Sequence, residues 1–239
     1  MIGLGTLINV AGIAAGGIVG RFFGKYFPDR MQDTLGKTCG VSVIFIGIAG
    51  AMEGMLSIDG QSLTSGQSML IVLCLVLGAF IGEALNIEHL FEQFGEWLKV
   101  KTGNGEDKKF VDDFVTASLT VCIGAMAIVG SIQDGIYGDY SILATKAVLD
   151  LIIILVMTCS MGVGCIFSAV PVALFEGLMT LLARLIRPLM TETALFNLSM
   201  IGSILIFCVG LNLVWEKKIR VANLLPAMIL AVILAFLPV

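Results

Sequence analysis

Two charged residues stand at the head of a long apolar run in this sequence. Lys146 and Asp150 belong to the stretch KAVLD, which is followed by LIIILVMTCSMGVGCIF. Their spacing of four places both side chains on one face of a helix. An ionisable group inside a membrane span costs about 2.5–3.5 kcal/mol on insertion scales, so a residue of this kind is a candidate for function.

The depths of the two residues differ, and this separates their roles. In a span that starts near residue 143, Lys146 lies about one turn deep and can extend its ammonium group to the membrane surface. Asp150 lies about 10 Å inside at ~1.5 Å per residue, and its side chain is too short to do the same. The pair predicts either a silent salt bridge, or a cation or proton site whose carboxylate Lys146 neutralises when the site is empty.

Two hydroxyl side chains are candidate partners of Asp150. Three apolar runs end in similar patterns of small residues, GGIVG, GAFIG and SMGVG, and aligning their last glycines places Thr6 and Ser68 at the position of Asp150. Oxygen ligands that converge on one axis suit a hard cation such as Na⁺ or Mg²⁺. Thr6, Ser68, Lys146 and Asp150 therefore form the predicted ion-binding group, with no resident metal ion and no cofactor.

Acidic residues near the ends of two further runs predict an outer mouth. Glu53, Asp134 and Asp139 lie in or beside the connections 57–65 and 133–142, which contain no lysine or arginine. Such a group would concentrate cations at the entrance of a channel, or would form an ordinary solvated rim.

A predicted helix break completes the set of candidate site residues. Gly162, Gly164 and Pro171 interrupt an apolar run, and proline lacks a backbone donor. A broken helix beside a repeat interface is typical of transport sites.

The composition places the chain in a lipid bilayer. Hydrophobic residues make up 58% and charged residues 13% of the 239 residues, and the mean hydropathy is +1.02. Soluble domains are about half apolar and a quarter charged. The net charge of −4 offers no basic stripe for nucleic acid. The six cysteines, which lie in or beside apolar stretches without a CxxC pair, are interpreted as small buried hydrophobes.

Seven stretches are apolar and long enough to span a membrane, which takes about 20 residues. An eighth candidate at 168–190 also carries Glu176 and two arginines, and seven spans are favoured over eight. The predicted spans are 2–20, 37–56, 66–83, 112–132, 143–164, 194–214 and 220–238.

The spans group into three similar units of span, interfacial helix and span, and a single span follows them. The tripeptide LFE at 90–92 recurs at 174–176, which favours an interfacial position for 168–190. Two spans per unit would make the units parallel copies. The expected fold is an all-α polytopic protein with one integral membrane domain, 1–239, made of units 2–56, 66–132 and 143–214, an extra span 220–238 and a polar cytoplasmic linker 99–113.

The distribution of lysine and arginine predicts the orientation in the membrane. The connections after the first, third and fifth spans are basic, and those after the second and fourth are not. Basic connections face the cytoplasm, so the N-terminus is expected outside and, with seven spans, the C-terminus inside. The segment EKKIR at 216–220 fits this orientation only with eight spans.

Four stretches of the chain resemble a family of uncharacterised bacterial inner-membrane proteins, the YqgA/YdfK-like proteins. They are GTLINVAGIAAGGIVGRFFG, ASLTVCIGAMAIVGSIQDGIYGDYSILATKAVLDLI, CSMGVGCIFSAVPVALFEG and GLNLVWEKKIRVANLLPA. The resemblance implies about seven spans in a bacterial cytoplasmic membrane, and the usual label of the family is a possible sodium channel or pump. It supplies no site residues.

These observations favour a passive channel or secondary transporter for a small cation, and Na⁺ and H⁺ are the preferred candidates. No HExxH, GxSxG, Walker or dinucleotide pattern occurs, so enzymatic chemistry is not expected. The alternative is a membrane scaffold or sensor whose polar pairs only lock helices together. The expected partners are the lipid bilayer and a small cation, and a homo-oligomer through the glycine-rich helix faces stays open.

Overall fold

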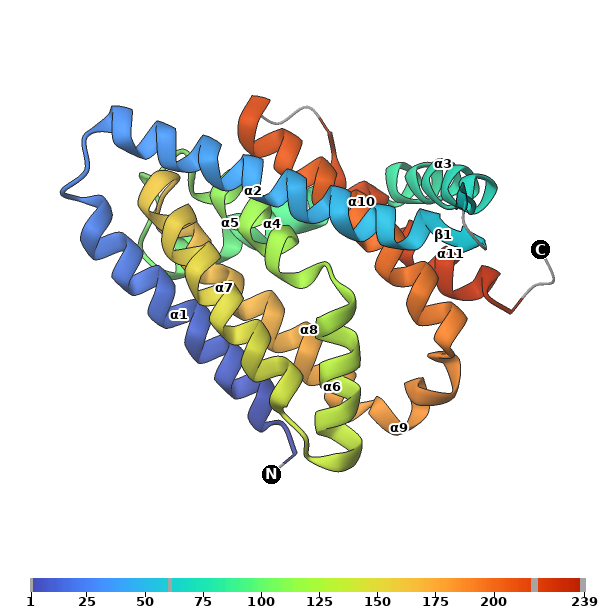
Figure 1. Ribbon diagram of the computed structural model, residues 1–239. Helices are drawn as coiled ribbons and strands as arrows, with labels where there is room; N and C mark the ends of the chain where they lie inside the picture. The colour runs from blue at the N-terminus through green and yellow to red at the C-terminus, as the bar shows by residue number, and fades with distance from the viewer. Residues whose placement is uncertain (1, 60–61, 216–218, 237–239) are drawn as a thin grey trace.

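The computed structural model describes residues 2–59, 62–215 and 219–236, and nearly all of them are helical (Figure 1). Within the described residues, the strands are β1 (Leu56–Asp59) and β2 (Ser62–Ser65), which pair as a short antiparallel hairpin. The helices are α1 (Leu4–Gly24), α2 (Asp29–Met55), α3 (Ser68–Leu85), α4 (Ile87–Lys101), α5 (Phe110–Cys122), α6 (Ala125–Tyr137), α7 (Ser141–Ser160), α8 (Ala169–Leu181), α9 (Ala183–Ile186), α10 (Glu192–Trp215) and α11 (Pro226–Leu234), with 3₁₀ turns η1 (Val163–Ser168), η2 (Arg187–Leu189) and η3 (Val221–Leu224).

Six helical segments among the described residues are long and apolar enough to cross a membrane, and up to seven if a bent pair counts as one span. Five of them are the expected spans that became α1, α2, α3, α7 and α10. The expected span 112–132 is instead the bent pair, because α5 and α6 meet at 63°. The expected span 220–238 contains η3 and α11, an apolar helical segment Val221–Leu234 that is shorter than a span, and residues 237–239 lie outside the described part of the chain.

The segment 168–190, expected at the membrane interface, is different in the structure. Its first part joins η1 to form one apolar helical segment of 19 residues, Val163–Leu181, which has the length of a span. Pro171 lies in the first turn of α8, where a missing N–H removes no helical hydrogen bond. The helix therefore runs through the proline, and only the part after residue 181 is short and irregular.

Glycines hold α1 and α7 together along their whole length. The two helices run parallel, side by side in Figure 1, because successive glycines of α1 face successive residues of α7. A Cβ atom on Gly12 would come within 2.9 Å of the Ala147 carbonyl oxygen, and one on Gly24 within 3.1 Å of Cys159 Cα. Such close backbone approach drives helix association in lipid, where no hydrophobic effect acts between helices.

Two further helix pairs pack through glycine in the opposite sense. Residues of α2 and α10 meet in reverse order, from Gly40 against Leu213 to Gly54 against Met200, so these helices are antiparallel. Gly78 of α3 packs against Ala227 of α11 in the same way. The glycine-rich faces of α1 and α3 are thus covered within one chain, and a homo-oligomer would need another surface.

The expected threefold parallel repeat is not confirmed by this arrangement. The first spans of units one and three, α1 and α7, are parallel as the repeat requires. Their second spans, α2 and α10, are antiparallel. The physical reason is α8, because a further helix of span length between α7 and α10 reverses the direction of α10.

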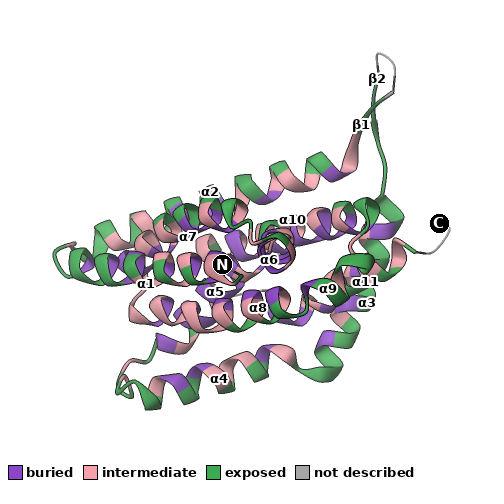
Figure 2. Ribbon diagram, turned by 90° about the horizontal axis from the view of Figure 1, so that it is seen from below, coloured by how far each residue is buried: buried purple, intermediate pink, exposed green. Residues whose placement is uncertain are grey.

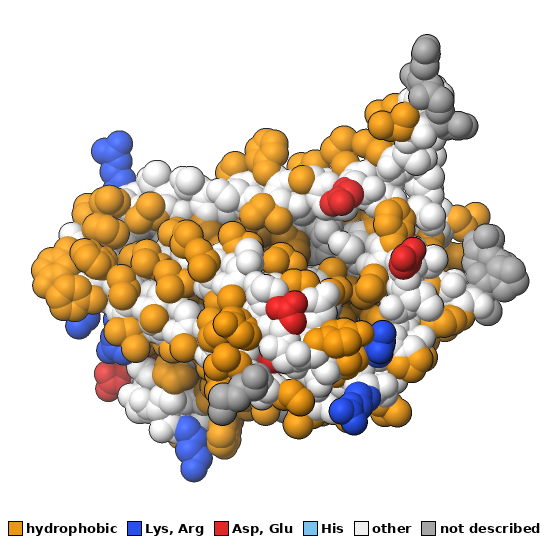
Figure 3. Space-filling view, turned by 60° about the horizontal axis from the view of Figure 1, so that its bottom comes forward, with side chains coloured by type: hydrophobic (Ala, Val, Ile, Leu, Met, Phe, Trp, Pro, Cys, Tyr) orange, Lys and Arg blue, Asp and Glu red, His pale blue; other side chains and the backbone are white. Residues whose placement is uncertain are grey.

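The outer surface of the helices is apolar. Large hydrophobic side chains such as Phe45, Phe80 and Ile152 are more than half exposed, and exposed residues, which are green in Figure 2, occur along most helices. Hydrophobic side chains also cover most of the face in Figure 3, where lysine and arginine side chains lie towards the margins. An exposed apolar surface of this extent is suited to lipid.

Candidate functional site

Lys146 and Asp150 form a buried ion pair on α7, as their spacing predicts. The side chains are 7% and 6% exposed, and the ammonium group contacts the Asp150 carboxylate directly. Lys146 does not extend towards the protein surface, as a side chain that reaches the membrane surface would. Its ammonium group points into the protein instead.

A second carboxylate from another helix faces the same ammonium group. Oε1 of Glu176, on α8, lies 3.7 Å from Lys146 Nζ, and this side chain is 1% exposed. The side-chain amide of Asn9, on α1, donates a hydrogen bond of 2.8 Å to the same Glu176 oxygen. The first helix and the successive helices α7 and α8 therefore contribute to one polar group, which we call the ionic cluster: Asn9, Lys146, Asp150 and Glu176.

Formal charge does not balance inside the ionic cluster. Two carboxylates surround one ammonium group, which leaves one negative charge if both acids are ionised. An uncompensated charge in an apolar interior costs several kcal/mol or more, so such groups bind a proton or another cation. The cluster therefore has the composition of a site for one monovalent cation.

Two oxygen atoms of the cluster are buried without a partner. Asn9 Oδ1 and Glu176 Oε2 accept no hydrogen bond, although buried polar atoms are nearly always paired. Both atoms are acceptors, and a proton on the carboxyl group or a bound cation would satisfy them. The unpartnered acceptor atoms and the excess negative charge would therefore both be satisfied by one added proton or cation.

The break between α5 and α6 contributes a backbone oxygen. Gly124, at φ +157°, separates the two helices, and the end of α5 leaves carbonyl groups without helical partners. One of these, the Val121 carbonyl, accepts a hydrogen bond of 2.8 Å from Lys146. A cation at a helix C-terminus is also stabilised by the helix dipole. Lys146 therefore ties the helix break to the two carboxylates.

The two hydroxyl residues predicted to accompany Asp150 lie in different parts of the structure. Thr6 is buried on α1 and lies 3.4 Å from the Thr180 hydroxyl of α8, one turn from Asn9. Ser68 is exposed at the start of α3, which packs on α11 and η3, so its predicted place beside Asp150 is wrong. The alignment failed because α3 does not pair with α1 and α7.

The predicted acidic mouth is not one group in the structure. Asp134 is fully buried, and its carboxylate accepts the backbone N–H groups of Gly3 and Gly5 at 3.2 and 2.9 Å. It satisfies donors at the start of α1 rather than facing water. Glu53 is exposed near the end of α2.

Asp139 is exposed before α7 and has the role of a helix-capping residue. The Ser141 hydroxyl and backbone N–H hold the pKa of Asp139 below its ordinary value, through hydrogen bonds of 2.5 and 3.0 Å. Of the three acids, only Asp139 and Glu53 have the solvent exposure that a mouth requires.

The predicted helix break at Gly162 and Gly164 is a tight connection between α7 and η1. Both glycines lie against the first turn of α5, where Asp113 Oδ2 would be 2.6 Å from a Cβ on Gly162. The backbone of Gly162 has a φ of +157°, which favours glycine. The break next to the ionic cluster is instead the one at Gly124, within the continuous apolar run that was expected to form the span 112–132.

Three members of the site were missed, and each left a signal in the sequence. Glu176 is an ionisable residue in an apolar run, so the same cost argument that selected Asp150 applies to it. Asn9 lies in the first apolar run of the chain. The Val121 carbonyl could be found only from Gly124, because the surrounding sequence is continuously apolar.

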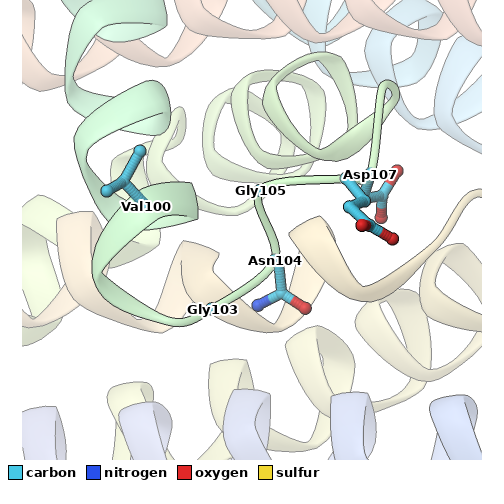
Figure 4. A pocket seen from close by; sticks show the side chains of 6 residues that line it. Val100, Gly103, Asn104, Gly105 and Asp107 are labelled. Atoms are coloured by element: carbon cyan, nitrogen blue, oxygen red, sulfur yellow. The ribbon is translucent and has the colours of Figure 1, made fainter.

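Surface hollows lie elsewhere. One is lined by Val100 and by residues of the loop 103–107, where Asn104 and Asp107 surround an open depression (Figure 4). A much smaller one is lined by Glu88, Asn212 and neighbouring apolar residues. Neither hollow includes a residue of the ionic cluster. Among the described residues, no group of three or more His, Cys, Asp or Glu side chains could hold a metal ion.

The apolar helices of span length and the buried ionic cluster define a polytopic α-helical membrane protein. The chain belongs to the family described as "Protein of unknown function (DUF554)", which matches residues 4–236.

Two relatives match nearly the whole chain. The "Uncharacterized membrane protein YdfK" of Bacillus subtilis (strain 168) is 26% identical over 232 residues, covering 97% of this chain and 95% of that protein. The "Uncharacterized protein YqgA" of Escherichia coli (strain K12) is 26% identical over 232 residues, covering 95% and 94%. No solved structure matches the chain significantly. The resemblance seen in the sequence is thereby confirmed.

Proposed function

We propose that this protein is a passive channel or secondary transporter for a small inorganic cation, Na⁺ or H⁺, in the bacterial cytoplasmic membrane. The observation that carries the proposal is the composition of the ionic cluster. Asp150 and Glu176 share one ammonium group, and a second cation is needed for neutrality. The unpartnered oxygens of Asn9 and Glu176 are ligands of the type that Na⁺ takes and that H⁺ satisfies.

Lys146 gives the site a built-in competitor for the transported ion. In the structure its ammonium group contacts Asp150 and lies 3.7 Å from Glu176, where it would compete with a second cation. An arriving cation would displace the ammonium group from one carboxylate. The ammonium group would stay nearby, because it also donates a hydrogen bond to the Val121 carbonyl at the helix break. Discontinuous helices whose free carbonyls meet charged groups are a recurring feature of transporters.

We further propose that the N-terminus lies outside and that the end of α10, at Trp215, faces the cytoplasm. The antiparallel packing of α2 and α10 supports this, because an outward α2 makes α10 run inward. Arg220, which follows α10, then lies on the cytoplasmic side, as the positive-inside rule requires, while residues 216–218 of EKKIR lie outside the described part of the chain. The apolar segment Val221–Leu234 is shorter than a span, and a reporter fused to the C-terminus tests on which side that end lies.

The alternative function, a scaffold or sensor, is supported by the hydrogen bond from Lys146 to the Val121 carbonyl. This contact would hold α5 against α7 in a protein that moves no ion. In that case the cluster has a structural role only, and replacing its acids changes stability without changing permeability.

Ion flux into liposomes that contain the purified protein separates the two functions. We expect Na⁺ or H⁺ to enter down its gradient, and Asp150→Asn and Glu176→Gln each to abolish the flux. The matched control is Glu92→Gln, because Glu92 is the glutamate of the other LFE tripeptide and its side chain is 38% exposed on α4. Absence of flux with every cation tested, or flux that is indifferent to both cluster variants, would contradict transport.

A further inference from the structure

A ladder of polar contacts leads from one end of the molecule to the ionic cluster. Its first rung is Asp134 with the N–H groups of Gly3 and Gly5, at the start of α1. The second is the pair Thr6–Thr180. The third is the hydrogen bond between Asn9 and Glu176. The α1 members are three residues apart, so the rungs share one face and are separated by about 4.5 Å.

The side chains of the ladder lie inside the protein, between helices. Thr6 and Thr180 are 7% and 5% exposed, and Asn9 is fully buried. The α6 helix closes the ladder on one side, because Gly135, next to Asp134, packs on the backbone of Thr180. Hydroxyl, amide and carboxyl oxygens at this spacing offer successive ligands to a small cation on its way to the ionic cluster.

On the other side of the ionic cluster the next turn of the same helices is apolar. Asn9, Asp150 and Glu176 each have a large buried hydrophobic residue one helical turn further from the ladder. These residues, which we call the apolar plug, are Ile13, Ile154 and Val172, and they are 0%, 0% and 1% exposed. They belong to one packed cluster that also includes Val121, Met157 and Cys165.

We propose that a small monovalent cation reaches the ionic cluster only from the end of the molecule where α1 begins, along the Thr6–Thr180 ladder, and that the apolar plug is the gate towards the opposite end. This inference rests on the proposed function and deepens it, because it assigns an entry route and a closed gate. An apolar constriction blocks ions by excluding water, and a polar ladder lowers the barrier on its own side.

The gate is tested by making the plug smaller. Ile154→Ala opens space directly below Asp150, and we expect the cation flux into liposomes to rise by about tenfold, which corresponds to about 1.4 kcal/mol off the barrier. Ile152→Ala is the matched control, because Ile152 is on the same helix and is 54% exposed. Flux that is unchanged in both variants, or raised equally in both, would overturn the gate.

The route is tested by chemical labelling from each side of sealed membranes. Thr6→Cys and Thr180→Cys are treated with a membrane-impermeant cationic thiol reagent, and the modified peptide is identified by mass spectrometry, so the native cysteines can stay in place. Asp139→Cys marks the end where α7, parallel to α1, begins. We expect both ladder cysteines to be labelled slowly and only from the side that labels Asp139→Cys.

The two tests distinguish failure of the route from failure of the proposed function. Labelling from the opposite side only, or from neither side, while the wild-type protein conducts cations, overturns the route and leaves transport standing. Labelling from the expected side in a protein that shows no flux, even with Ile154→Ala, supports the route as a water-accessible vestibule and overturns transport. If one ladder variant fails to fold, the other gives the same information, because Thr6 and Thr180 are on different helices.

Discussion

Replacing Lys146 with methionine should damage the protein more than replacing its partner. Methionine keeps the length of the side chain and removes the charge. Asp150 then loses its ammonium partner, Glu176 loses its nearest cation at 3.7 Å, and the Val121 carbonyl loses its donor. Removing one partner of a buried ion pair costs about 3–5 kcal/mol, because the remaining charge is uncompensated.

Asp150→Asn is the milder change for a structural reason. Lys146 keeps two partners, Glu176 and the Val121 carbonyl, and the asparagine oxygen still accepts a hydrogen bond. The loss is expected near the 1–3 kcal/mol of a perturbed buried hydrogen bond. The variant Lys146→Met with Asp150→Asn and Glu176→Gln, which carries no charge in the cluster, should recover part of the loss of Lys146→Met.

Denaturant titration of the purified protein in detergent measures these free energies of unfolding. Lys101→Met is the matched control, since Lys101 is exposed at the end of α4 and a surface substitution should change stability by less than about 0.5 kcal/mol. If Lys146→Met costs no more than Asp150→Asn, or if the uncharged triple variant is less stable than Lys146→Met alone, the charge argument is refuted.

Two further predictions concern packing and capping. Gly16→Ala should destabilise the protein by about 1–3 kcal/mol, because a Cβ there would overlap the Leu151 carbonyl of α7. Gly177→Ala, with open space around its Cβ, should stabilise α8 by up to about 1 kcal/mol. Equal effects of the two variants in a thermal melt would contradict the close glycine packing of α1 on α7. Asp134→Ala should cost about 0.5–2 kcal/mol of stability, because two N–H groups at the start of α1 lose their acceptor. Amide hydrogen exchange should become faster at residues 3–5 only, and unchanged exchange there would contradict this capping role.

The membrane class and the central ion pair could be predicted from the sequence because both follow from local cost. Apolar runs of about 20 residues and charges inside them are visible one segment at a time. Five of the expected spans and the contact of Lys146 with Asp150 are accordingly present in the structure.

The partners of the pair could not be predicted, because they depend on which helices pack together. Glu176 was assigned to an interfacial helix through the LFE tripeptide, but the two copies differ in the structure: Glu176 is 1% exposed and the Glu92 side chain 38%. A three-residue match carries no information about depth. Ser68 was misplaced for the same reason, since α3 packs against α11 by glycine contacts that the sequence of α3 alone does not specify.

The distance in sequence between Asn9 and Glu176 has a consequence for biosynthesis. The two residues are 167 positions apart, so at about 5–20 residues per second the ribosome makes Glu176 roughly 10–30 s after Asn9. For most of that interval α1 is already made, while α7 and α8, which cover its glycine and asparagine face, are not. The nascent protein must therefore keep α1 apart from premature partners until the last third of the chain arrives, and any chain that stops before residue 176 is left with an incomplete cluster for quality control to recognise.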